Sequence, residues 1–206
     1  MTPIAQLVSS HAAEVEGYER RAAAAQGTAV RLDPARVAKC RHTNFAVDYF
    51  SPEFQRLKAS IERVSGNIEP IKVRPMPEGG HEIVYGHARL QACLELGLAV
   101  AAVVDELQDR EVVLQFVLHQ SFKSKPSPWR LGAVLAVALD SGVFPSIRRM
   151  ADAVGMDLSE VATLTRLHRL PDVLKEAQKG KFLSPRAIKK LLAGYETDPA
   201  KHRSGL

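Results

Sequence analysis

The chain has 206 residues, enough for one large domain or two small ones. Its hydrophobic content of 46% and charged content of 25% are typical of a soluble protein, and no apolar run of about 18 residues predicts a membrane span. The net charge is +5, but residues 1–122 carry a balance of −2 and residues 123–206 a balance of +7. This asymmetry indicates that the second half meets a polyanion.

Two further features exclude other classes of protein. The N-terminus has no basic region followed by an apolar one, so we expect no secretory signal and a cytoplasmic protein. Cys40 and Cys93 form no close pair, which predicts reduced thiols and no zinc site.

The first 122 residues predict an arm and then an α+β domain. Residues 1–27 are polar and Ala-rich, which favours a loosely attached or disordered arm with helical propensity. After it, short β-rich stretches alternate with helical segments over residues 28–122. Ser51-Pro52 opens one of these helices, and we expect Gly66-Asn67 to end it.

The remaining residues, 123–206, predict an all-α domain. The polar, Pro-containing segment KSKPS at Lys123 marks the boundary. Ser127-Pro128 opens a helix, Pro171 begins another and Ser184-Pro185 caps the last. The fold class expected for the chain is therefore an α+β domain followed by an all-α domain.

The segment at about 147–169 has the spacing of a helix-turn-helix. Ala151 is small enough for two helices to cross, Gly155 tolerates the positive φ of a tight turn, and Val161 packs the second helix on the first. Met150, Val154, Leu158 and Leu164 complete the predicted apolar face.

The second helix, about Leu158 to His168, is predicted to enter the major groove of double-stranded DNA. Its outward side chains can form hydrogen bonds with bases, and nearby cations can bind phosphates. Glu160 repels phosphate unless it accepts a hydrogen bond from a cytosine amino group. The predicted DNA-binding residues are Arg148, Arg149, Ser159, Glu160, Thr163, Arg166, Arg169, Lys181 and Arg186.

Four segments in the same order resemble the ParB family of partition proteins, especially its plasmid-borne branch. They are RHTNFAVDYFSPEFQRLKASI from Arg41, GNIEPIKVRP from Gly66, HEIVYGHARLQACLELGL from His81, and SPWRLG followed by the helix-turn-helix. The resemblance covers about residues 32–192 and implies a ParB/sulfiredoxin-like N-terminal domain.

The resemblance also implies a function. Proteins of this family bind a centromere-like DNA site, bind CTP with Mg²⁺ in the N-terminal domain, and act as a homodimer that closes as a sliding clamp. It implies contact between residues 1–27 and a ParA-type ATPase, with Arg20 or Arg21 as the stimulatory residue. The nucleotide pocket would use Gly86, His87, Ala88, Arg89 and Gln120.

Several residues depart from the family pattern. Glu69 stands where Gln is usual, and Ala88 stands where an Arg is expected, which removes a bidentate phosphate contact. His119 and Gln120 replace a Glu-Asn pair, and they are poorer ligands for Mg²⁺. We therefore predict weak or absent CTP binding, doubtful CTP hydrolysis, and no catalytic or metal-binding residue.

Two alternatives stay open at this point. One is a ParB-like transcriptional regulator or accessory factor without a nucleotide switch. The other is an enzyme, either a CTPase or a nuclease. Sulfiredoxin has its reactive Cys immediately before a His, and here Gly86 precedes His87, so that chemistry lacks its nucleophile. Cys93 instead falls in the apolar face of the following helix and is expected to be a core residue. Asp105, Glu106 and Asp109 are close enough in sequence for a metal, but we expect them to form a solvated turn between a strand and a helix.

Overall fold

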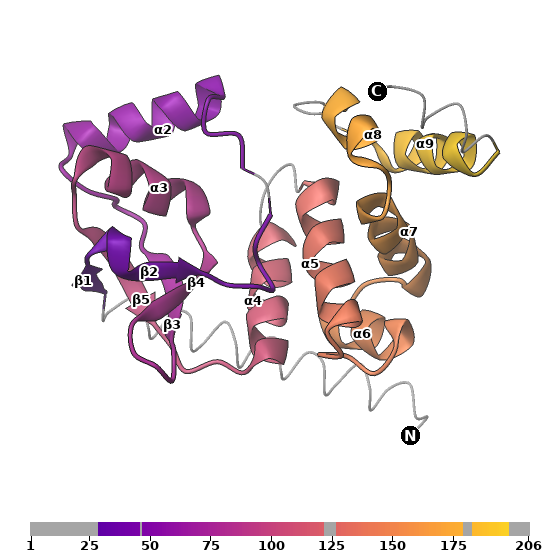
Figure 1. Cartoon of the computed structure of the whole chain (residues 1–206), viewed down its shortest axis with the longest axis horizontal. Helices are drawn as coiled ribbons and strands as arrows, with labels where there is room; N and C mark the ends of the chain where they lie inside the picture. The colour runs from indigo at the N-terminus through magenta and orange to yellow at the C-terminus, as the bar shows by residue number, and fades with distance from the viewer. Residues whose placement is uncertain (1–28, 46, 122–126, 179–182, 198–206) are drawn as a thin grey trace. The chain divides into compact units, whose positions relative to one another are not determined.

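The structure is a computed structural model that describes residues 29–45, 47–121, 127–178 and 183–197 (Figure 1). It divides into two compact units, residues 1–116 and residues 117–206. The predicted arm at residues 1–27 lies outside the described residues, and the predicted domain limits at 27 and 122 stay predictions. None of the described helices is long and apolar enough to cross a membrane.

The first unit is built on a five-stranded mixed sheet. Its strand order is β1-β5-β3-β4-β2, with antiparallel β1–β5 and β3–β4 pairs and parallel β3–β5 and β2–β4 pairs. The strands are β1 (Val30–Leu32), β2 (Val37–Lys39), β3 (Ile71–Pro75), β4 (His81–Tyr85) and β5 (Val100–Val104). The other elements are the 3-10 helix η2 (Pro34–Arg36), α2 (Pro52–Arg63), α3 (His87–Leu96) and α4 (Asp109–Ser121), which runs across the boundary of the two units. The predicted α+β fold of this region is confirmed.

Local sequence signals explain where α2 and α3 begin and end. The Ser51 hydroxyl accepts a hydrogen bond from the Phe54 N–H at 3.3 Å, and Pro52 occupies the first turn. Gly97 ends α3 with a φ of 65°. The predicted end of α2 at Gly66-Asn67 is wrong, because the helix ends at Arg63 and Ser65 already has a φ of 55°.

One face of the sheet is apolar and is covered by α2 and α3. Side chains of α2 and α3 meet those of strands β2, β3, β4 and β5 in one core. Its buried members are Val37, Phe54, Ile61, Ile71, Val73, Ile83, Ala92, Cys93, Val100 and Ala102. The prediction that Cys93 is a core residue is confirmed.

The opposite face of the sheet meets the start of α4 and is less uniform. Successive residues of a strand point to opposite faces, so Val84 lies on this side while Ile83 lies on the other. Val84 packs with Cys40 and with Val112 of α4. Charged side chains of β3 share this face, and they belong to the ion pairs described below.

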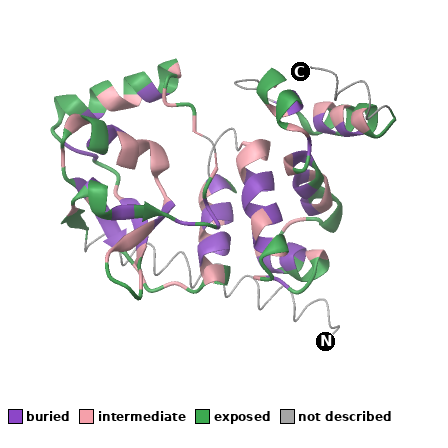
Figure 2. Cartoon of the chain, viewed as in Figure 1, coloured by how far each residue is buried: buried purple, intermediate pink, exposed green. Residues whose placement is uncertain are grey.

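The second unit is helical in its described residues, as predicted. Its helices are α5 (Pro128–Asp140), α6 (Ile147–Val154), α7 (Leu158–His168), α8 (Asp172–Ala177) and α9 (Pro185–Thr197). As Figure 2 shows, α5 is buried over much of its length. Leucine and isoleucine side chains from the end of α7 to α9 form a second core: Leu167, Leu170, Leu174, Leu183, Ile188 and Leu192.

A glycine allows α5 and α7 to approach closely. A Cβ atom at Gly132 of α5 would lie 2.4 Å from the backbone oxygen of Leu164 in α7. No side chain fits at that distance, so the two helices can pack this closely only because residue 132 is a glycine. This contact fixes the position of α7 within its unit.

Candidate nucleic-acid interface and phosphate loop

Helices α6 and α7 are joined by a short turn with the predicted residue chemistry. The Ser146 hydroxyl accepts a hydrogen bond from the Arg149 N–H at the start of α6, at 3.2 Å. Gly155 follows α6 with a φ of 68°, and the Met156 N–H donates to the Ala151 carbonyl at 3.1 Å. Ala151 and Val161 are both buried. The positive φ and the packing roles predicted for these residues are confirmed.

The apolar face of these helices differs from the prediction at one position. Met150 and Leu164 are buried and Val154 is half-buried. Leu158 is 39% exposed, so its predicted place in the core is wrong. It is the first residue of α7, where the chain has only just entered the helix and the partner helix does not cover it.

The predicted DNA-contacting side chains of α7 lie mainly on its exposed side. Ser159, Glu160 and Arg166 are exposed, whereas Thr163 is half-buried. The Thr163 hydroxyl donates to the Ser159 carbonyl at 2.7 Å, which ties it to its own helix. The face that α7 presents to solvent is therefore polar, with Arg166 as its cation.

The other predicted phosphate ligands lie on three elements of the second unit. Arg148 and Arg149 are exposed on α6, and Arg186 is exposed on α9. Arg169 follows α7 and forms an exposed ion pair with Asp140 at 2.7 Å. Lys181 lies outside the described residues.

One contact of the predicted recognition helix was missed by sequence reasoning. Arg166 of α7 forms an ion pair with Glu196 of α9, and both side chains are about half exposed. Thirty residues separate the two in sequence, so no helical spacing could reveal the pair. Surface pairs of this kind contribute about 0–1 kcal/mol, and an anionic ligand can displace the carboxylate.

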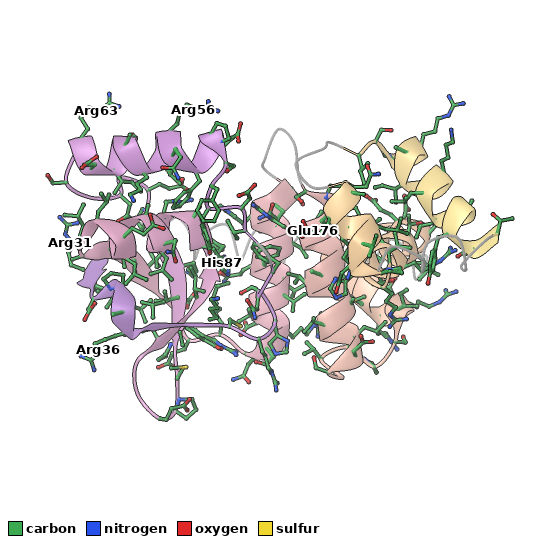
Figure 3. The ribbon with its side chains drawn as sticks, turned by 45° about the horizontal axis from the view of Figure 1, so that its top comes forward. Arg31, Arg36, Arg56, Arg63, His87 and Glu176 are labelled. Atoms are coloured by element: carbon green, nitrogen blue, oxygen red, sulfur yellow. The ribbon has the colours of Figure 1, made fainter. Side chains whose placement is uncertain are left out.

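The predicted phosphate loop does open a helix. Gly86 has a φ of 102°, and a Cβ there would lie 2.7 Å from the Ile71 side chain, so glycine is required. Helix α3 begins at the next residue, His87 (Figure 3), whose ring lies 4.6 Å from that of Phe45. Ala88 is half-buried and packs against the apolar core.

The arginine of this loop is engaged by the chain itself. Arg89 Nη1 donates to the carbonyl oxygens of Glu69 at 2.9 Å and Pro70 at 2.8 Å. Its Nη2 lies 3.0 Å from the Glu69 carboxylate, and only 14% of the side chain is exposed. Glu69 is the residue that replaces the usual glutamine, and it supplies Arg89 with an internal anion.

A buried cation lies on the α4 face of the same sheet. Lys72 of β3 is 2% exposed and forms an ion pair with Asp105 at 2.9 Å. Its neighbour across the β3–β4 pair is Tyr85. Burial raises the pKa of Tyr85, Arg89 lowers it, and the nearby Glu69 and Asp105 carboxylates raise it further.

A second group of charges gathers at the start of α4. Arg74 contacts Glu82 and, at 2.7 Å, Asp109. Asp109 also accepts hydrogen bonds from Arg41 at 2.8 Å and lies 3.1 Å from His42 Nε2. Burial alone would raise the pKa of Asp109, but the hydrogen bonds from Arg74, Arg41 and His42 outweigh it and hold the pKa well below its ordinary range.

These contacts correct the prediction of a solvated acidic turn. Asp105 directly follows β5 and Asp109 begins α4, but each carboxylate neutralises a cation of the sheet. In the described part of the chain, no group of three or more His, Cys, Asp or Glu residues could hold a metal ion.

Gln120, the last predicted pocket residue, is buried in the final turn of α4 and belongs to the second unit.

Comparison with known proteins identifies the family. Residues 23–120 match the family model described as the ParB N-terminal domain. The "Nucleoid occlusion protein" of Listeria innocua is 31% identical over 132 residues, which are 64% of this chain and 46% of that protein. The "Probable chromosome-partitioning protein ParB" of Vibrio cholerae is 29% identical over 135 residues, or 65% of this chain and 45% of that protein.

The chain thus spans less than half the length of these curated relatives. Among solved structures, a C-terminally truncated chromosome-partitioning protein ParB from Caulobacter crescentus, complexed with CTP-gamma-S, is similar over 84% of this chain and 97% of that one. Its 21% identity and TM-score of 0.41 are too low to support an argument about ligands. The family model and the curated relatives agree, and the chain belongs to the ParB family.

Proposed function

We propose that this ParB-family protein binds a centromere-like DNA site and acts in plasmid or chromosome partition. In this proposal α6 and α7 form a DNA-binding helix-turn-helix, and α7 enters the major groove. The observation that carries the proposal is the exposed polar side of α7, with Ser159, Glu160 and Arg166, together with the exposure of Arg148 and Arg149 on α6.

The charge distribution supports the same interface. Residues 123–206 carry a balance of +7, whereas residues 1–122 carry −2. Cations that neutralise phosphates release counterions from DNA and supply most of its sequence-independent binding. Relatives named as a nucleoid occlusion protein and a chromosome-partitioning protein also favour a role on DNA.

We also propose that the phosphate loop binds CTP weakly or not at all. Nucleotide phosphates would have to compete with Glu69, which already holds the Arg89 guanidinium at 3.0 Å. Ala88 offers no polar side chain beside it. The backbone N–H groups at the start of α3 are the remaining anion donors of the loop, and they alone make a weak site.

The same contact also favours a second candidate function, a transcriptional regulator or accessory factor that needs no nucleotide. The two candidates differ in their partners. A partition protein acts with a ParA-type ATPase, for which we propose residues 1–27 as the contact, and as a homodimer. Stimulation of such an ATPase by the full chain would favour partition, and repression of a promoter without any effect on plasmid loss would favour regulation.

DNA binding can be tested with duplexes selected from a random pool by the full chain. We expect the selected duplex to bind at least 100-fold more tightly than a scrambled duplex at a fixed salt concentration. Arg166→Ala should reduce that preference by about 10-fold, because a base contact of this kind contributes about 1–3 kcal/mol. If no duplex is enriched by selection, the proposed function is wrong.

The nucleotide loop can be tested in the same assay with labelled CTP. We expect no CTP binding by the wild type with or without the selected duplex, and no change in duplex affinity for Arg89→Ala. Glu69→Gln releases the Arg89 guanidinium from its internal anion and should increase any residual CTP binding. Duplex-stimulated CTP binding by the wild type would contradict the degenerate loop and indicate a working clamp.

A further inference from the structure

Three exposed apolar side chains come from the ends of α2 and α3 in the first unit. Ile68 is 84% exposed, and Val64 and Leu94 are each about half exposed. Val64 directly follows α2, Ile68 lies in the segment that leads to β3, and Leu94 belongs to the last turn of α3. One exposed apolar residue is ordinary on a protein surface, but several that lie together mark a contact surface.

Arg31 of β1 lies against the segment that carries two of these side chains. A Cβ atom at Gly66, midway between Val64 and Ile68, would lie 2.8 Å from Arg31 Nη1. The same nitrogen donates to the Ala99 carbonyl oxygen at 3.4 Å. The Arg31 guanidinium is therefore fixed beside the chain between Val64 and Ile68.

Leu94 joins this group through its neighbour Cys93. The Cys93 thiol donates to Asn67 Oδ1 at 3.7 Å, and Asn67 directly precedes Ile68. Burial raises the pKa of the Cys93 thiol, whereas Asn67 and the nearby positive charge of Arg31 oppose the rise. The end of α3, the segment before β3 and the Arg31 guanidinium are thus close together.

A second arginine lies at the same end of α2. Arg63 is the last residue of that helix, and Figure 3 shows it at the opposite end from Arg56, on the side of the unit where Arg31 lies. Among the described residues, no carboxylate forms an ion pair with Arg31 or Arg63. We call these five residues the α2-end surface: Val64, Ile68, Leu94, Arg31 and Arg63.

The nearby carboxylates leave the charge of this surface available. Glu69 and Glu95 are each held by an internal cation, at 3.0 Å and 2.6 Å. Glu62 is exposed beside Arg63, but consecutive side chains of a helix point about 100° apart. The α2-end surface therefore combines an apolar centre with two guanidinium groups that can meet an external anion.

We propose that the α2-end surface docks a short amphipathic segment of a second protein, in which apolar side chains are flanked by Asp or Glu. Val64, Ile68 and Leu94 cover the apolar side of that segment. Arg31 and Arg63 pair with its carboxylates, which a planar guanidinium binds through two parallel hydrogen bonds. The contact is separate from DNA binding, which we propose for the second unit.

Two other occupants fit this surface less well. A nucleic acid presents phosphates and sugars, and an exposed apolar centre gives these groups no partner. An anionic membrane favours a strongly basic surface, but residues 1–122 carry a balance of −2. Both occupants are outcomes of the test.

The test selects peptides with the full wild-type chain from a displayed library of random peptides of about 16 residues. We expect the enriched peptides to combine Leu, Ile or Phe with Asp or Glu. The dissociation constant of one enriched peptide is then measured by fluorescence anisotropy with the wild type and with each variant. Thermal unfolding of every variant checks that the fold is intact.

The first pair of variants tests the apolar centre. Ile68→Ser should weaken peptide binding about 10-fold or more, because side chains at the centre of an interface contribute most of its energy. The matched control is Val173→Ser, which removes an exposed apolar side chain from α8 of the second unit and should change the affinity less than about 2-fold. Affinity for the selected DNA duplex should be the same in Ile68→Ser and the wild type.

The second pair tests the charged rim. Arg63→Glu should weaken peptide binding about 10-fold at low salt and much less near 0.5 M salt, because salt screens exposed charges. Arg36→Glu makes the same change of charge elsewhere on the first unit (Figure 3) and should have less than about a third of that effect.

Each contrary result points to a different cause. The inference is overturned if no peptide is enriched, if Ile68→Ser leaves the affinity unchanged, or if the enriched peptides are basic. Binding to vesicles with about one-third phosphatidylserine that Ile68→Ser abolishes would make a membrane the occupant instead. Loss of duplex affinity in Ile68→Ser would make DNA the occupant, and tighter binding of a peptide of residues 1–28 than of any enriched peptide would assign the surface to the chain's own N-terminal segment.

Discussion

Two groups of cations, one in each unit of the protein, differ in their exposure and in their partners. In the first unit, Lys72, Arg74 and Arg89 each lie within 3.0 Å of a carboxylate, and all three are at most 15% exposed. In the second unit, Arg148 and Arg149 are exposed on α6, and Arg186, Lys189 and Lys190 are exposed on α9. The whole-chain charge of +5 conceals this difference. Formal charge alone therefore does not indicate where an anion can bind, because the internal partners of each cation decide it.

The difference has an energetic basis. A buried charge must keep its partner, since removing one member of a buried pair costs about 3–5 kcal/mol. An exposed charge contributes little to folding and remains available to a ligand. Substitutions that remove the partners of Lys72, Arg74 or Arg89 should therefore change stability and not DNA affinity, and substitutions of exposed charges in the second unit should do the reverse.

The largest expected effect is that of Asp105→Asn. It leaves the Lys72 ammonium, which is 2% exposed, without a counter-charge. We expect the free energy of unfolding to fall by about 3 kcal/mol, measured by urea denaturation, with unchanged duplex affinity of the folded protein. The matched control is Asp140→Asn, which removes the exposed partner of Arg169 and should cost less than about 0.5 kcal/mol. Equal urea midpoints for the two variants would show that the buried pair of Lys72 contributes no more to stability than the exposed pair of Arg169.

A second prediction concerns the stability of the helical unit, which depends on close packing. Gly132→Ala places a methyl group where the Leu164 carbonyl oxygen lies 2.4 Å away. The helices must separate, and we expect a loss of about 2 kcal/mol despite the better helix propensity of alanine. The control, Gly194→Ala in α9, meets no atom within 4 Å and should instead gain about 0.5–1 kcal/mol. A stabilised Gly132→Ala variant would show that the α5–α7 contact is loose.

A third prediction uses pH. In the folded chain the pKa of Asp109 lies below its ordinary value of 3.8. The ionised carboxylate therefore stabilises the folded protein at pH values above 3.8, and this contribution is lost as the pH falls towards the folded pKa. Asp109→Asn should lose about 1 kcal/mol at pH 7, a modest effect because the side chain is about a third exposed. The difference from the wild type should narrow steadily as the pH falls from about 5 to about 2. A constant difference over that range would exclude the carboxylate as its source.

Features encoded by neighbouring residues could be predicted from the sequence. The turn at Gly155, the buried Ala151 and Val161, and the cap at Ser51 each follow from spacings of a few residues. The α+β and all-α character of the two halves follows from the same local patterns.

Features that join distant segments could not be predicted in this way. Strand β2 has only three residues and exists through its parallel pairing with β4, so no local pattern predicts it. The Asp105 and Asp109 carboxylates were expected in solvent because their partners, Lys72 and Arg74, lie more than 30 residues earlier in the chain. The substitution at Glu69 was visible in the sequence, but its contact with Arg89 was not.

The smallest effect should come from Glu196→Gln. This substitution tests whether Arg166 behaves as a structural cation or as one that is available to DNA. Arg166 belongs to the exposed helical unit, yet it has an internal carboxylate like the cations of the first unit. If the pair behaves as an exposed one, its loss should leave stability within about 0.5 kcal/mol of the wild type. Since DNA then no longer competes with Glu196 for the guanidinium, duplex affinity should rise about 2- to 4-fold, and Arg166→Ala should abolish that gain. A loss of stability without a gain in affinity would place Arg166 among the structural cations and leave base recognition to the other side chains of α6 and α7.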